Sequence, residues 1–63
     1  MLDSELVTEP EAAEFLRMSR GGLANARRDK RGPPFIKLGR MVRYRTKDLL
    51  RYVDEHARQP NAG

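Results

Sequence analysis

The sequence predicts a mostly α-helical fold with one small β-hairpin. Three observations predict it: two short amphipathic helices one or two residues apart, a run of alternating apolar and basic residues around a glycine, and a final amphipathic helix. The chain has 63 residues, and a domain of that size buries only about 60% of its unfolded surface. We expect one domain over residues 6–57, a short lead over 1–5 and a disordered tail over 58–63.

The first helix is predicted from about Glu9 to Arg17, because Thr8-Glu9-Pro10-Glu11 is a typical helix start. The Thr8 hydroxyl can accept from the amide of Glu11, whose carboxylate can reach back to the amide of Thr8. Helical spacing then predicts these buried residues: Ala12, Ala13, Phe15 and Leu16.

The second helix is predicted from Arg20 to about Asp29, with Ser19 as its N-cap. Its inward residues are Leu23 and Ala26. Arg17 falls in the turn between the helices, where glycine would be easier if the backbone becomes left-handed. The segment Lys30-Arg31-Gly32-Pro33-Pro34 ends the helix, since glycine suits the C-cap and proline cannot continue a helix.

A hairpin is predicted from the alternation in Phe35–Leu38 and Val42–Arg45. A three-residue loop, Gly39-Arg40-Met41, pairs Leu38 with Val42 and Ile36 with Tyr44, so all four apolar residues share one face. The other face would carry Lys37, Arg43 and Arg45. A two-residue loop would instead expose Ile36 and Leu38, so burial favours the longer loop.

A third helix is predicted from Thr46 as cap, with Asp48 in its first turn. Its inward residues are expected to be Leu49, Leu50, Val53 and Ala57, which would close the core. Two short helices, a tight turn, a basic hairpin and a packing helix together make a winged helix-turn-helix order.

Charge is segregated along the chain. Residues 17–47 hold eleven Lys or Arg and one acid, Asp29, a net charge of +10, whereas the remaining residues sum to −6. A surface that gathers one sign of charge suits condensed phosphate and salt-dependent binding.

The sequence has no cysteine, an acidic N-terminus and no apolar run of about 18 residues, so we expect no signal peptide, no membrane span and a cytoplasmic protein.

Candidate contact residues follow from this order, since the second helix of the motif enters the major groove. Base reading is expected from Ser19, Arg20, Gly22 and Asn25, and phosphate contacts from Arg27 and Arg28. On the wing, Arg40 is expected in the minor groove or on the backbone, supported by Lys37, Arg43 and Arg45. Purely structural interpretations stay open: Ser19 can be a helix cap alone, an exposed asparagine such as Asn25 is common on helices, and Gly21-Gly22 can form a loose first turn.

Five segments carry a resemblance to a known family. They are Thr8–Leu16, Met18-Ser19-Arg20, Pro34–Arg40, Val42-Arg43-Tyr44 and Asp48-Leu49. Over about Leu6 to His56 the chain resembles the small excisionase and MerR-like winged-helix family, which includes phage and plasmid excisionases (recombination directionality factors) and AlpA-like transcription regulators. The resemblance implies DNA binding through the second helix and the wing. The Gly21-Gly22 pair departs from the polar residues usual there.

Other classes of function fit the residues less well. His56 is the sole histidine, Asp54 and Glu55 point in different directions on a helix, and Tyr52 lies beside an apolar stripe, so we expect no enzyme, metal or cofactor. RNA recognition would need exposed aromatics, for which Phe35 is the one candidate. A membrane-surface role would need a basic amphipathic helix, but much of the positive charge lies on the hairpin and loop. Nor is a small-molecule ligand expected.

Within DNA binding, an excisionase is the first hypothesis and a small transcription regulator the second. A full MerR-type regulator adds a long dimerising helix and an effector domain, for which too little sequence follows Ala57. We expect one copy at each half-site or repeat, contacts between neighbouring copies, DNA bending and a cognate integrase as a possible partner.

Overall fold

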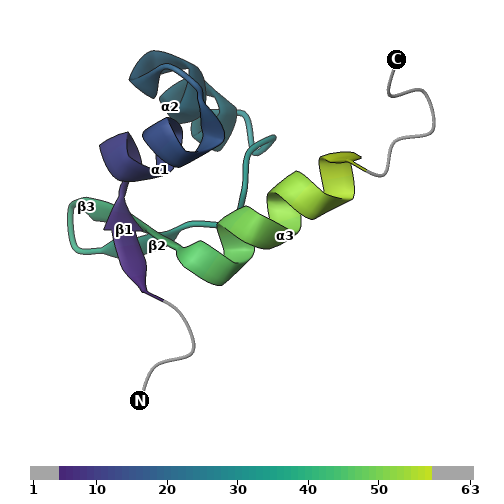
Figure 1. The fold of residues 1–63 in the computed structure, drawn as a ribbon. Helices are drawn as coiled ribbons and strands as arrows, with labels where there is room; N and C mark the ends of the chain where they lie inside the picture. Colours follow the sequence, from purple (N-terminus) through teal and green to yellow (C-terminus); the bar gives the residue numbers. More distant parts are fainter. Residues whose placement is uncertain (1–4, 58–63) are drawn as a thin grey trace.

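The structure is a computed structural model that describes residues 5–57. Residues 1–4 of the expected lead and the whole expected tail, 58–63, lie outside the described residues. The elements, in chain order, are β1 (Leu6–Thr8), α1 (Glu9–Leu16), α2 (Arg20–Arg28), β2 (Ile36–Leu38), β3 (Met41–Arg45) and α3 (Thr46–Ala57). The helix pair α1–α2 lies on one side of the small sheet, and α3 follows directly from β3 (Figure 1).

Both predicted N-caps of the helix pair are confirmed. The amide of Thr8 donates to the Glu11 carboxylate at 2.8 Å, and the amide of Glu11 donates to the Thr8 hydroxyl at 3.2 Å. At α2 the amide of Gly22 donates to the Ser19 hydroxyl at 2.9 Å. These bonds satisfy backbone N–H groups that a helix start leaves without intrahelical partners, so both helices begin where local sequence places them.

The sheet has three strands in the order β1-β3-β2, whereas the sequence predicted only the hairpin. In β1, Val7 pairs with Tyr44, and beyond the strand the amide of Thr46 donates to the carbonyl of Glu5 at 2.9 Å. The Thr46 hydroxyl accepts from the amide of Glu5 at 3.1 Å. The expected capping role of Thr46 was therefore wrong: its side chain extends the pairing of β1 with β3, and Thr46 is itself the first residue of α3.

The predicted hairpin register was also wrong. Leu38 pairs with Met41 and Ile36 with Arg43, which leaves a two-residue loop, Gly39-Arg40. Gly39 has φ of 65° and Arg40 has no positive φ, the pattern of a type II′ turn, in which glycine comes first. Lys37 therefore lies on the face of Val42 and Tyr44, while the opposite, outer face carries Ile36, Leu38, Met41, Arg43 and Arg45.

The core forms where the helix pair meets Tyr44 and the start of α3. Its buried members are Ala12, Ala13, Leu23, Tyr44 and Leu49, and Val7, Leu16, Met18 and Val42 pack against them. Val7, supplied by the unpredicted strand β1, packs against this core, whereas Ile36 and Leu38, which were expected there, lie on the outer face of the wing. The expected inward residues of α2, Leu23 and Ala26, are both buried.

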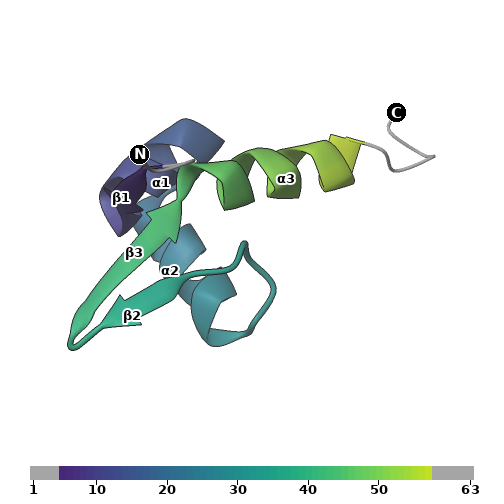
Figure 2. The ribbon, with the colours of Figure 1, turned by 90° about the horizontal axis from the view of Figure 1, so that it is seen from below.

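Four other apolar residues expected in the core are exposed. Phe15 is 51% exposed because residues 12, 13 and 16 already form the inward face of α1 and Phe15 lies at its edge. Leu50 and Val53 are 58% and 45% exposed, and Ala57 is exposed as well. Only the first turn of α3 reaches the core, whereas its C-terminal half runs out past the other elements (Figure 2). Within residues 5–57, no helix has the length and apolar character that crossing a bilayer requires.

Candidate nucleic-acid interface

The second helix of the pair, α2, has one face toward the core and one toward solvent. Its outward face carries four exposed residues: Arg20, Gly21, Asn25 and Arg28. Gly21, Asn25 and Arg28 follow the i, i+4, i+7 spacing of one helical face. A Cβ added at Gly21 would meet nothing within 4 Å, so the backbone itself is open to a partner there.

Gly22, which the sequence singled out, is partly buried. A Cβ at this position would lie 3.0 Å from the Ser19 hydroxyl oxygen, so Gly22 packs against the cap. Sequence reasoning missed Gly21 as the outward glycine, although its helical spacing with Asn25 and Arg28 was available as a signal. Ser19 is exposed beside this surface, with its hydroxyl engaged in the cap.

Arg27 lies on the inner edge of α2 and is held by the chain itself. Its Nε and Nη2 donate to the two carboxylate oxygens of Glu9 at 2.7 and 3.2 Å. Tyr44 Oη also donates to Glu9, at 2.8 Å. The Arg27 guanidinium lies 5.8 Å from the centre of the Phe35 ring. We call Glu9, Arg27, Tyr44 and Phe35 the inner tie, because they connect α1, α2, β3 and the segment that leads to β2.

Electrostatics within the inner tie favour the ionised pair. The hydrogen bond from Arg27 lowers the pKa of Glu9, and the same bond raises the pKa of Arg27. Burial, with the bond to the Glu9 carboxylate, raises the pKa of Tyr44 well above its usual range. Tyr44 therefore stays a donor and Glu9 an acceptor at neutral pH. This arrangement gives Arg27 a role in the fold, distinct from the phosphate contact expected from the sequence.

The wing distributes its cations over its tip and both faces. Arg40 is exposed in the turn, and Lys37 is exposed on the face of Val42. On the outer face, Arg43 is half-buried and donates to the carbonyl of Val42 at 2.9 Å. Arg45 forms an ion pair with Asp48 at 3.5 Å. Arg40 and Lys37 are thus the wing cations most open to an external partner, whereas Arg43 and Arg45 are partly engaged.

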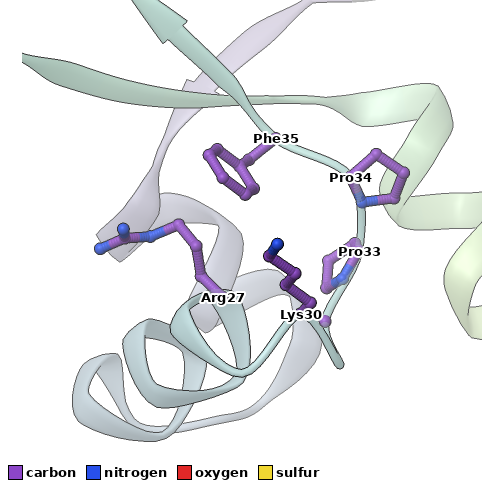
Figure 3. A pocket seen from close by; sticks show the side chains of 6 residues that line it. Arg27, Lys30, Pro33, Pro34 and Phe35 are labelled. Atoms are coloured by element: carbon purple, nitrogen blue, oxygen red, sulfur yellow. The ribbon is translucent and has the colours of Figure 1, made fainter.

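A recess lies between the end of α2 and the segment leading to β2 (Figure 3). It has a volume of about 330 Å³ and is lined by Arg27, Lys30, Gly32, Pro33, Pro34 and Phe35. In Figure 3 the Lys30 side chain extends into the space beside Phe35 and Pro33. Of its two cations, Arg27 is held by Glu9, and Lys30 makes no ion pair within residues 5–57.

Four exposed cations of α2 and the wing make no ion pair with an acid among residues 5–57. Among residues 5–57, ion pairs form at Arg27, Arg31 and Arg45, and none forms at Arg20, Arg28, Lys37 or Arg40. The same part of the chain contains no group of three or more His, Asp or Glu arranged to hold a metal ion. The surface can therefore offer hydrogen-bond donors and positive charge to a polyanion.

Comparison with known proteins agrees with this geometry. A family model described as a helix-turn-helix domain matches residues 6–57, from β1 to the end of α3. In comparisons with curated proteins and with solved structures, no relative matches the chain. The matched span contains the capped helix pair, the tight turn and the wing, and the chain belongs to the helix-turn-helix domain family of DNA-binding modules.

Proposed function

We propose that this protein is a sequence-specific double-stranded DNA-binding accessory protein that acts as an excisionase. In this role it binds repeated sites in attachment-site DNA, bends the duplex and directs a cognate integrase toward excision. The observation that carries the proposal is the outward face of α2, where Arg20, Asn25 and Arg28 are exposed and make no ion pair within residues 5–57.

The proposed docking places the N-terminal half of α2 in the major groove. Arg20 can donate two hydrogen bonds to guanine, and Asn25 can pair with adenine; each contact contributes about 1 to 3 kcal/mol of discrimination. Arg28 then lies over phosphate. Gly21 supports a close approach, since no side chain separates the helix backbone from the groove.

The wing supplies a second point of contact. Arg40 at the tip binds the backbone or the adjacent minor groove, and Lys37 contacts phosphate beside it. Arg43 and Arg45 have secondary roles here, because both make bonds within the chain. Contacts in two neighbouring grooves resist straightening of the duplex, so several copies side by side can bend DNA without doing chemistry.

The test is excision by a cognate integrase with and without the protein, using Arg20→Ala as a matched variant with weakened base reading. The proposal predicts that excision rises with the wild-type protein and rises less with Arg20→Ala at the same protein concentration. Unchanged excision, together with altered output from a promoter beside the binding site, would instead identify a small transcription regulator, the alternative that the same DNA-binding surface supports.

A further inference from the structure

Two basic residues adopt a backbone conformation that normally belongs to glycine. Arg17, after α1, and Lys30, after α2, both have φ of 59°, and they are the non-glycine residues with positive φ within residues 5–57. The one glycine with positive φ among residues 5–57 is Gly39, in the wing turn. The chain thus uses glycine where the wing turns, and a cation at each end of the recognition helix.

The conformation is imposed by how the two helices end. After α1, the backbone amide of Met18 donates to the carbonyl of Ala13 at 2.9 Å, and the backbone amide of Arg17 donates to the carbonyl of Glu14 at 3.1 Å. After α2, the backbone amide of Arg31 donates to the carbonyl of Ala26 at 2.8 Å, and the backbone amide of Lys30 donates to the carbonyl of Arg27 at 3.1 Å. Both ends are Schellman motifs, whose left-handed residue is usually glycine because a Cβ is strained there.

No polar contact within residues 5–57 explains why Arg17 and Lys30 carry this strain, although the Lys30 side chain lines the recess beside Phe35. Both residues are exposed, and neither forms an ion pair or a side-chain hydrogen bond within the described part of the chain. Strain that the fold does not need points to a functional requirement for the side chain.

Arg17 and Lys30 flank α2 at its opposite ends. Arg17 precedes the nine-residue helix and Lys30 follows it, so a helix that lies in the major groove carries one exposed cation at each end, where phosphates border the groove. We propose that Arg17 and Lys30 are phosphate clamps, one at each end of α2 beside the groove that the helix occupies. This inference rests on the proposed docking of α2.

The test is substitution of each residue by glycine, which relieves strain and removes charge together. Arg17→Gly and Lys30→Gly should each raise the folding equilibrium constant by about two- to fivefold, measured by urea unfolding. Each should also weaken binding to an arbitrary duplex of about 20 base pairs by on the order of fivefold and lower the slope of log K against log salt by about 0.9. Stability and affinity therefore move in opposite directions.

Conservative variants separate the effect of the side-chain charge on DNA binding from the effect of the strained backbone on stability. Arg17→Lys and Lys30→Arg keep both the charge and the strain, and should retain the salt slope and the stability of the wild-type protein. The clamps would be overturned if the glycine variants bind duplex DNA with an unchanged slope of log K against log salt, while Arg28→Ala lowers that slope by about one unit. That result would leave the docking of α2 intact. If Arg28→Ala also binds like the wild-type protein, the docking itself is wrong.

Discussion

Arg27 and Arg28 are neighbours in the sequence, yet they belong to two different regions of the molecule. Arg27 lies in the inner tie, where Glu9 takes both of its hydrogen bonds and Phe35 faces its guanidinium. Arg28 lies on the outward face of α2, is exposed and makes no ion pair within residues 5–57. A basic residue is available to DNA only where the chain does not already neutralise it, so counting cations overstates the binding surface.

The largest expected effect is at Glu9, on which the inner tie depends. Glu9→Ala leaves the Arg27 charge and the Tyr44 hydroxyl without their shared acceptor, which we expect to cost about 2 to 3 kcal/mol of unfolding free energy. A domain this small rarely has more than about 3 to 5 kcal/mol, so the variant should be close to unfolding at room temperature. Urea denaturation followed by circular dichroism measures it.

Glu14→Ala is the matched control, since Glu14 is an exposed acid on the same helix. Its unfolding free energy should stay within about 0.5 kcal/mol of the wild-type value. Equal losses in the two variants would show that Glu9 has no special role.

Exchanging the two arginines for alanine tests the comparison directly. Arg27→Ala should lose about 1 to 2 kcal/mol of stability, because two bonds to a carboxylate disappear. Arg28→Ala should keep its stability and lose about one unit of salt slope on duplex DNA. Salt titrations at a temperature where both variants are folded separate the effects. The comparison fails if Arg27→Ala lowers the salt slope as much as Arg28→Ala does.

A smaller effect distinguishes the two glycines of α2. Gly21→Ala should stabilise the fold by about 0.5 to 1 kcal/mol, because alanine favours a helix and its Cβ meets nothing within 4 Å. It should also weaken DNA binding if the helix approaches the groove closely. Gly22→Ala places its Cβ 3.0 Å from the Ser19 hydroxyl and should gain less or lose stability. Thermal unfolding and duplex binding of both variants measure this; unchanged binding by Gly21→Ala would argue against close approach.

Acid should weaken the inner tie. The pKa of Glu9 lies below its ordinary 4.5 in the folded protein, so its contribution is complete above pH 4.5 and is lost as the pH falls through the folded-state value. The pKa of Glu11 is lowered by its cap bonds with Thr8 and acts in the same direction. Glu9→Gln should therefore flatten the fall in stability below pH 4.5 without abolishing it. A pH profile as steep as that of the wild-type protein would assign acid sensitivity to other groups.

Local interactions explain which parts of the fold could be predicted from sequence. The capping box at Thr8 and the cap at Ser19 depend on residues three apart, and both formed as expected. Likewise Leu23 and Ala26 were identified by helical periodicity alone. The strand β1 could not be foreseen, because three residues carry too little pattern and its partner, β3, is more than thirty residues away in the chain.

The hairpin register failed because the prediction assumed that every apolar residue must be buried. Gly39 at the first loop position indicated the two-residue turn, and Val7 of β1, not Ile36 or Leu38, packs against the core. The phosphate contact expected of Arg27 stays a prediction, but local sequence did not reveal the bond that holds this side chain within the fold. Its partner Glu9 is eighteen residues away, and nothing local distinguishes Arg27 from Arg28.

The most direct test of the central claim is selection of duplexes from a randomised pool by the wild-type protein and by Arg20→Ala. If the outward face of α2 reads bases, the wild-type protein should select a defined motif, and Arg20→Ala should lose preference at one base pair of it while keeping the rest. Selection of the same motif with the same preference by both proteins would contradict base reading by α2.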